Sequence, residues 1–136
     1  MKRIFSTRYS ENAVSFAALV LRLVAGSLLL VMHGLDKLMH FIQKSEAFPD
    51  PFGIGSSSSL ALVVFAEFFC SALVILGLLT RLAAIPIVIN MGVALFVAHH
   101  GDLFGKGESA GLFFAAFVAL LFIGPGKVSI DRMIAK

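Results

Sequence analysis

Four long apolar stretches dominate the sequence, and short polar or turn-forming segments separate them. An α-helix rises about 1.5 Å per residue, so about 20 residues cross a hydrocarbon core of about 30 Å. The first two stretches reach this length alone, and the last two reach it when flanking residues are included. We therefore predict four membrane-spanning helices, at about 14–35, 60–79, 82–100 and 108–124.

The composition agrees with a lipid environment. Of 136 residues, 59% are hydrophobic and 14% are charged, whereas a soluble domain is about half apolar and a quarter charged. The single cysteine, Cys70, excludes an intrachain disulfide and a cysteine-rich metal or iron–sulfur site built by this chain alone. The net charge of +3 comes from residues at the chain ends and beside the apolar stretches, so we expect the lipid bilayer, and no nucleic acid, as partner.

The first apolar stretch also has some features of a signal peptide, because Lys2, Arg3 and Arg8 precede it. However, Arg22 would interrupt the apolar core of such a peptide, and no small-residue cleavage site follows. We expect this helix to stay in the protein, as part of a single domain that covers residues 1–136.

The distribution of basic residues predicts the orientation. With both termini in the cytoplasm, most Lys and Arg residues lie inside, as the positive-inside rule requires. These are Lys2, Arg3, Arg8, Arg81, Lys127, Arg132 and Lys136, against Lys37, Lys44 and Lys106 outside. The predicted fold class is an all-α integral membrane four-helix bundle with antiparallel up-down topology, in a bacterial inner membrane. Residues 36–59 form an external loop, and its serines at 56–59 are suited to cap the second helix.

Two ionisable residues, Arg22 and Glu67, fall within the predicted spans. A charge in a membrane costs about 2.5 to 3.5 kcal/mol on insertion scales, so each is a candidate functional residue that needs a partner. Each lies about 12 Å from one of the two membrane surfaces, so that their levels differ by about 6 Å. A long arginine side chain can cross this distance. We therefore predict an Arg22–Glu67 pair, with Asn90 in the same network.

A polar stripe is predicted on the first helix. Gly26, His33 and Lys37 follow Arg22 at intervals that place all four within about 60° of arc. Gly26 would leave room for a neighbouring helix or a flat ligand. The four histidines, His33, His40, His99 and His100, fall near the outer end and, with Lys37 and Glu108, suggest a polar vestibule.

Other interpretations of these residues stay open. Arg22 and Glu67 could only fix the packing of two helices, and His33 and Lys37 could be ordinary interfacial residues. His99 and His100 could only end a helix, and Cys70 fits a small packing residue. A haem or metal held by His33 with His99 or His100 is not expected, because no ligand motif with tight spacing is present.

Several short motifs occur in a characteristic order. Arg22 is followed by Gly26, then by His33-Gly34-x2-Lys37, Glu67, Gly77-Leu-Leu-Thr80-Arg81, His99, Glu108 and Gly124-Pro125-Gly126-Lys127-x-Ser129-x-Asp131. In order and spacing, they resemble the DoxX family of small four-helix membrane proteins, from about residue 16 to the C-terminus. The resemblance implies quinone-linked redox chemistry, since the family includes the membrane subunit of a thiosulfate:quinone oxidoreductase and a component of an oxidative-stress complex.

Two functional hypotheses follow. In the first, the chain is a quinone-binding subunit of a membrane redox system. Arg22 or Lys37 would polarise a quinone oxygen, His33 would relay protons and Glu67 would hold Arg22 or carry a proton, with Gly26, Asn90 and His99 lining the pocket. Such a chain is not expected to be catalytic alone, so a redox partner subunit or a homo-oligomer is expected. In the second, it is a non-enzymatic small transporter or a membrane-complex assembly subunit.

Overall fold

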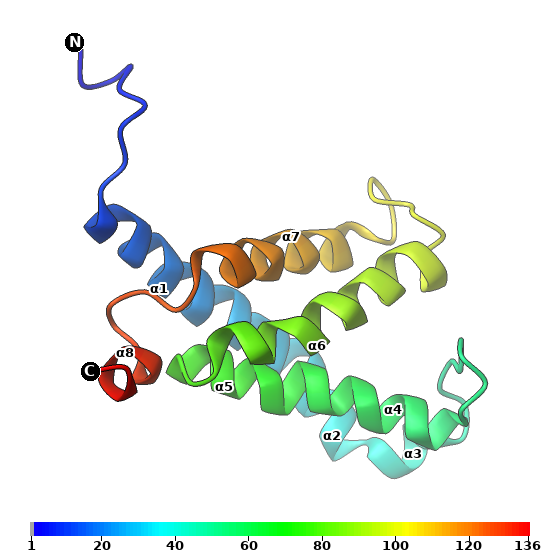
Figure 1. The fold of residues 1–136 in the computed structure, drawn as a ribbon. Helices are drawn as coiled ribbons and strands as arrows, with labels where there is room; N and C mark the ends of the chain where they lie inside the picture. Colours follow the sequence, from blue (N-terminus) through cyan, green and yellow to red (C-terminus); the bar gives the residue numbers. More distant parts are fainter. Residues whose placement is uncertain (1) are drawn as a thin grey trace.

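The computed structural model describes residues 2–136, and every regular element among them is a helix (Figure 1). We name three long helical segments as spans. Span 1 consists of α1 (Glu11–Leu29), η1 (Leu30–Gly34) and α2 (Leu35–Met39). Span 2 consists of α4 (Ser56–Val64), η2 (Phe65–Cys70) and α5 (Ser71–Leu76), and span 3 of α6 (Thr80–Val93) and η3 (Ala94–Ala98). The remaining helices are α3 (Phe41–Ser45), α7 (Glu108–Ile123) and α8 (Ile130–Ile134).

Three of these helical segments are long and apolar enough to cross a membrane. They are the three spans, of 29, 21 and 19 residues. The fourth long helix, α7, is apolar but shorter, at 16 residues. The predicted all-α membrane fold is confirmed.

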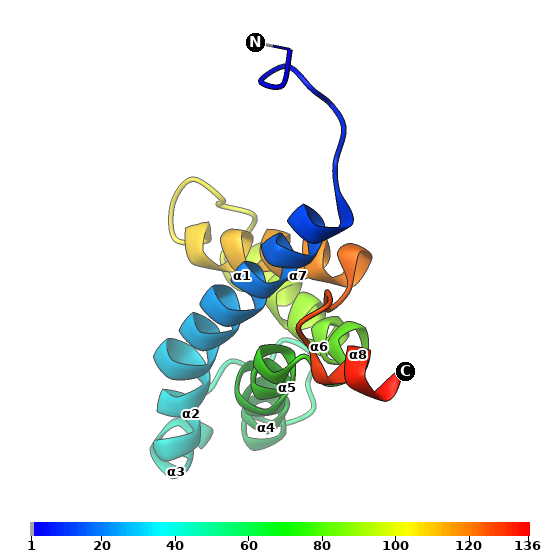
Figure 2. The same ribbon diagram turned by 90° about the vertical axis from the view of Figure 1, so that its left-hand side faces the viewer.

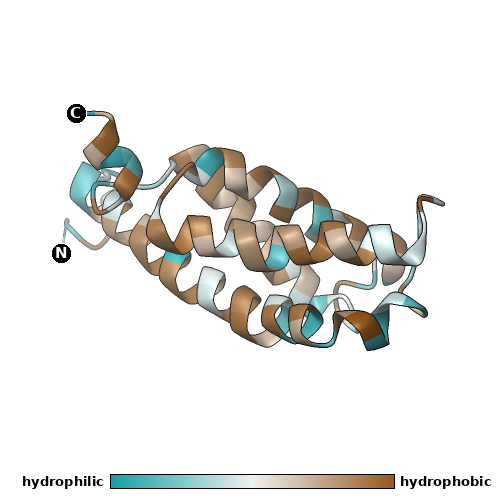
Figure 3. Cartoon of the chain, turned by 90° about the horizontal axis from the view of Figure 1, so that it is seen from below, coloured by the Kyte–Doolittle hydropathy of each residue, from teal (hydrophilic) through white to brown (hydrophobic). Residues whose placement is uncertain are grey.

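The four rods alternate in direction (Figure 1). The start of α1 and helix α8 lie at the same end of the molecule, which we call the termini end (Figure 3). The connections between spans 1 and 2 and between span 3 and α7 lie at the opposite end, the loop end (Figure 1). Figure 2 shows the segment before α1 extending away from the helices. Which end faces the cytoplasm remains a prediction.

The ends of span 1 differ from the predicted positions. Ser10 caps α1 by accepting a hydrogen bond from the Ala13 N–H, so the helix begins at Glu11. At its other end span 1 continues through Met39, because Asp36 and Lys37 are compatible with a helix. The connection expected over residues 36–59 is therefore shorter and includes the short helix α3.

Asp50 organises this connection. Its carboxylate accepts hydrogen bonds from the N–H groups of Ile54 and Gly55 and from the Ser59 hydroxyl. These bonds lower the pKa of Asp50, the one from Gly55 most of all. No serine side chain caps α4; the residue before the helix is Gly55. Asp50 thus fixes the chain at the start of span 2, a role that we had predicted for serines 56–59.

The core between the rods is built from small and aliphatic side chains and one phenylalanine. Leu29, Val74, Ile87, Phe117 and Leu120 are completely buried. Figure 3 shows that most residues along the rods are hydrophobic, and many large apolar side chains on them are exposed. The rods approach most closely where Gly34 lies against the backbone of Glu67: a Cβ atom on Gly34 would come within 2.5 Å of the Glu67 carbonyl oxygen. Small residues allow such contacts between membrane helices.

Candidate functional site

Each of the three spans contains one π-helical turn. These turns are η1, η2 and η3, and η2 packs against both η1 and α6. A π-turn closes its hydrogen bonds over five residues, is rare, and is frequently found at functional sites. In each span, the extra residue of the π-turn rotates the side chains of the loop-end half about the helix axis, relative to those of the termini-end half. Most of the polar residues considered above lie in or beside these turns.

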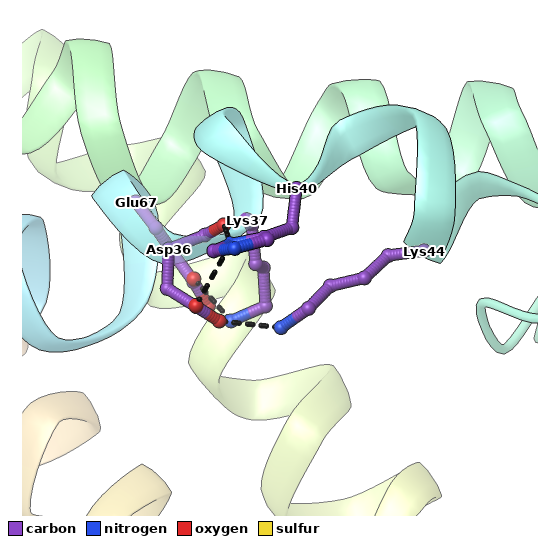
Figure 4. A network of polar contacts seen from close by, with 5 residues as sticks. All are labelled: Asp36, Lys37, His40, Lys44 and Glu67. Atoms are coloured by element: carbon purple, nitrogen blue, oxygen red, sulfur yellow. Dashed lines mark hydrogen bonds and ion pairs between the residues drawn. The ribbon is translucent and has the colours of Figure 1, made fainter.

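The centre of the site is Glu67, on η2. Its side chain is only 6% exposed, and both carboxylate oxygens are bound. Oε2 pairs with the Lys37 Nζ at 2.7 Å, and Oε1 accepts a hydrogen bond from the Asn90 Nδ2 at 3.0 Å. Figure 4 shows Lys37 reaching Glu67 from span 1. One carboxylate therefore joins all three spans.

The donors around Glu67 are not fully used. Lys37 carries three N–H donors and Asn90 two, together with a carbonyl acceptor. The structure gives each of them one side-chain hydrogen bond, to Glu67. Lys37 is 19% exposed and Asn90 is half-buried. The site thus has a buried anion at its centre and polar groups with spare hydrogen-bonding capacity around it.

His33 lies one turn before Lys37 in span 1, on the same face of the helix. Its half-buried ring packs edge-to-face against Phe113 of α7, with 5.5 Å between the ring centroids. His33 therefore adds a titratable group between span 1 and α7. Among the described residues, no hydrogen bond joins it directly to Glu67.

A second polar group lies beside the site, at the exposed loop end. Asp36, next to Lys37 in sequence, pairs with Lys44 and lies 3.2 Å from the Nδ1 of His40. Figure 4 shows this group together with the Glu67–Lys37 pair. All three side chains are at least 40% exposed. Acidic and basic groups thus extend from the buried Glu67 to the surface.

The predicted Arg22–Glu67 pair is wrong. Arg22 is 2% exposed and donates to four backbone carbonyls: those of Val74, Ile75, Pro125 and Val128, at distances of 2.6 to 3.0 Å. Val74 lies seven residues beyond Glu67, about 10 Å along the helix. Arg22 therefore lies at the level of the end of α5, and Lys37, fifteen residues later in span 1, is the cation that reaches Glu67. Asn90 does join the network of Glu67, but not that of Arg22.

Arg22 stabilises the termini end. Val74 and Ile75 are in the last turn of α5, where the helix dipole places partial negative charge on the carbonyls. Pro125 and Val128 belong to the segment after α7, so one guanidinium joins three parts of the chain. Gly77 lies so close that a Cβ atom there would come within 2.5 Å of the Arg22 Nη2.

Asp131, which was predicted only as part of a family motif, also stabilises the termini end. Its carboxylate accepts hydrogen bonds from the N–H groups of Leu79 and Thr80 at the start of α6. Burial acts to raise the pKa of Asp131, but the hydrogen bonds from Thr80 and Leu79 and the charge of Arg22 outweigh it, so the pKa is lowered. Arg81 similarly donates to the carbonyls of Leu121 and Phe122 at the end of α7.

The remaining predicted residues lie outside the cluster. Gly26 is a packing position, since a Cβ atom there would come within 2.7 Å of the Ile75 side chain. His99 ends η3 and is half-buried, and His100 follows it with a left-handed backbone. Within residues 2–136, no three His, Cys, Asp or Glu side chains gather to form a metal site.

Comparison with known proteins places these features in a family. The model of the DoxX family matches residues 17–100, which include Arg22, Glu67 and the surrounding cluster. A relative from Mycobacterium tuberculosis, described as an uncharacterized membrane protein, is 31% identical over an alignment of 135 residues. The match covers 88% of this chain and 82% of the relative. No solved structure matches the chain. The chain is a membrane protein and belongs to the DoxX family.

Proposed function

We propose that this chain is the membrane subunit of a quinone-linked redox system in a bacterial inner membrane, and that a quinone binds beside Glu67, Lys37, Asn90 and His33. The buried Glu67–Lys37 pair, closed by Asn90, is the observation that supports this proposal. Burying such a pair in an apolar bundle costs free energy, and ionisable residues inside membrane segments commonly mark functional sites. Its residues combine hydrogen-bond donors with groups that take up and release protons.

The residues fit the chemistry of a quinone. A quinone presents two carbonyl oxygens on a flat apolar ring and supplies the capacity to accept two electrons and two protons. Lys37 and Asn90 have N–H donors beyond those bound to Glu67. The Ser71 hydroxyl, one turn from Glu67, is buried without a hydrogen-bond partner among the described residues. The site can therefore offer polar contacts to a lipid-soluble ligand without first breaking its own bonds.

The chain's own residues would handle protons. Glu67 can hold or release a proton at its carboxylate, and His33 can do so at its ring. Asp36 and His40, at the exposed loop end, connect this part of the molecule to water. Electrons would come from a partner subunit, since this chain has one cysteine and no dinucleotide-binding motif.

Quinone titration of the purified protein tests this proposal. Lys37→Met should weaken quinone binding at least about tenfold, because a hydrogen bond from a charged donor contributes about 1.5 to 3 kcal/mol. Lys44→Met is the matched control, since Lys44 also pairs with a carboxylate but lies at the exposed loop end. It should bind quinone like the unmodified protein.

Two results would overturn the proposal. One is an unmodified protein that neither retains a quinone on extraction nor binds one on titration. The other is equal quinone affinity in the Lys37→Met and unmodified proteins. Either result would favour the alternative, a small transporter or an assembly subunit whose charged groups move protons or contact another membrane protein.

A further inference from the structure

A pocket of about 250 Å³ lies at the termini end, between the start of α1, the end of α7 and the segment that leads into α8. Its lining includes the polar side chains Tyr9, Lys127 and Arg132 and the apolar side chains Val14, Ala18 and Ile123. None of these six residues belongs to the candidate functional site, which is in the loop-end half of the molecule.

The charged side chains of this pocket lie nearest the end of the bundle, and the side chains deeper along α1 are apolar except for the Ser15 hydroxyl, which accepts a hydrogen bond from the Lys127 N–H. Tyr9 precedes α1, whereas Val14 and Ala18 follow at about one and two turns into the helix. This order matches a molecule with a polar head and an apolar chain, aligned with the lipids of a bilayer.

The charge at the polar end favours an anionic head. Lys127 donates to the Asn12 side chain at 2.7 Å and lies 3.5 Å from Glu11, whose carboxylate is 88% exposed. Such an exposed pair is weak, so Lys127 remains available to an anion. The Arg132 guanidinium has no side-chain partner within residues 2–136. The pocket thus combines two cations with one carboxylate, that of Glu11.

The chain around the pocket carries exposed apolar side chains. Val128, Met133 and Ile134 are 62 to 70% exposed; Val128 follows Lys127, and Met133 and Ile134 follow Arg132. An element with apolar and basic side chains at the end of a membrane bundle is suited to the boundary between headgroups and acyl chains. Basic pockets at this level bind anionic phospholipids.

We propose that this pocket binds one anionic phospholipid. Arg132, Lys127 and the Tyr9 hydroxyl hold the phosphate group, and an acyl chain lies along Val14, Ala18 and Ile123. The inference concerns a separate site and does not depend on quinone binding.

Native mass spectrometry of the full chain, with phosphatidylglycerol and phosphatidylcholine of identical acyl chains, tests this inference. Arg132→Gln should weaken phosphatidylglycerol binding about fivefold, the effect of one cation near an anionic lipid surface. Phosphatidylcholine binding should weaken less, because the choline cation of this lipid offsets the charge of its phosphate. Lys106→Gln, which removes an exposed cation at the loop end, is the matched control and should leave both affinities unchanged.

Glu11→Gln provides a test with the opposite sign. It removes the carboxylate of the pocket and should strengthen phosphatidylglycerol binding, whereas damage to the fold would weaken it. The proposal is overturned by equal effects of Arg132→Gln and Lys106→Gln, or by equal affinity of the unmodified protein for the two lipids. Competition by inorganic phosphate at the lipid's own concentration would instead identify a site for free phosphate and would also overturn it.

Discussion

At the scale of single residues, the two buried charges have different roles. Glu67 is paired with side chains, which can change their protonation or move toward a ligand. Arg22 is bound only by backbone carbonyls, which have no other state to adopt. Burial of Glu67 is therefore consistent with a binding site, whereas burial of Arg22 holds separate parts of the chain together.

Replacing Arg22 should therefore affect folding. Arg22→Ala should lower the free energy of unfolding by about 3 kcal/mol or more, because four carbonyls lose their donor. Arg22→Lys should recover only part of this loss, since an ammonium group lacks the planar set of donors. Unfolding in detergent measures both, with Arg8→Ala, at an exposed position, as control. Equal stability of Arg22→Ala and the unmodified protein would contradict the structural role.

The Glu67–Lys37 pair should show strong energetic coupling. In a double-mutant cycle with Glu67→Gln and Lys37→Met, each single variant leaves a polar partner without its counterpart. The double variant should therefore be more stable than the sum of the single effects predicts, by about 1.5 kcal/mol or more. The free energies of unfolding of the four proteins in mixed micelles give this value. Additive effects would show that the two groups do not interact in the folded protein.

At the scale of elements, the apolar stretches predicted the helices well, because length and hydrophobicity alone define a membrane span. The helix ends were less predictable. Glu11 and Asn12 before the first stretch, and Asp36 and Lys37 after it, are polar residues that a helix accepts equally well. The helix therefore includes Lys37, the cation that pairs with Glu67.

The partner of Arg22 could not be read from the sequence for a second reason. Side chains can be identified as potential partners, whereas backbone carbonyls occur at every residue and become available only where a helix ends. Knowing that α5 ends at Leu76 would have identified Val74 and Ile75, two of the four acceptors. The π-turns were also not predicted, because the length and spacing of apolar residues do not distinguish a π-turn from an α-turn.

Asp131 makes the junction between α5 and α6 sensitive to acid. Its pKa is lower in the folded protein than in the unfolded chain, so its contribution to stability is complete above about pH 4. This contribution is lost as the pH falls through the folded-state pKa. Asp131→Asn should reduce the stability at pH 7 by about 0.5 to 1.5 kcal/mol, because the amide keeps one of the two acceptor oxygens and loses the hydrogen bond at the other.

Thermal unfolding between pH 7 and pH 3 measures this effect. The unmodified protein should lose more stability over this range than Asp131→Asn does, so the two curves converge at low pH. Asp102→Asn, at an exposed position in the connection before α7, is the control. Parallel curves for the Asp131→Asn and unmodified proteins would rule out the effect.

At the scale of the whole molecule, the two ends have different polar chemistry. Arg22, Arg81 and Asp131 bind backbone groups at the termini end, whereas Glu67, Lys37 and Asn90 bind one another toward the loop end. About 10 Å along span 2, from Glu67 to Val74, separates the two groups. Variants at one end should therefore leave the other largely intact, since distant sites contribute independently to stability.

The orientation of the molecule can be tested with single cysteines. In a Cys70→Ala background, Lys106→Cys at the loop end should react with a membrane-impermeant maleimide in intact cells. Lys136→Cys at the termini end should react only after the membrane is opened, because the basic residues favour a cytoplasmic location for that end. The reverse labelling pattern would show the opposite orientation.

The three π-turns have a consequence for how this family can vary. A π-turn holds about one residue more than an α-turn, and one residue corresponds to about 100° of rotation. A single-residue insertion or deletion at η1, η2 or η3 would therefore turn the loop-end half of that span while its termini-end half kept its phase. A one-residue change at a π-turn would thus place different side chains beside Glu67, while the junction that Arg22 maintains would keep its contacts.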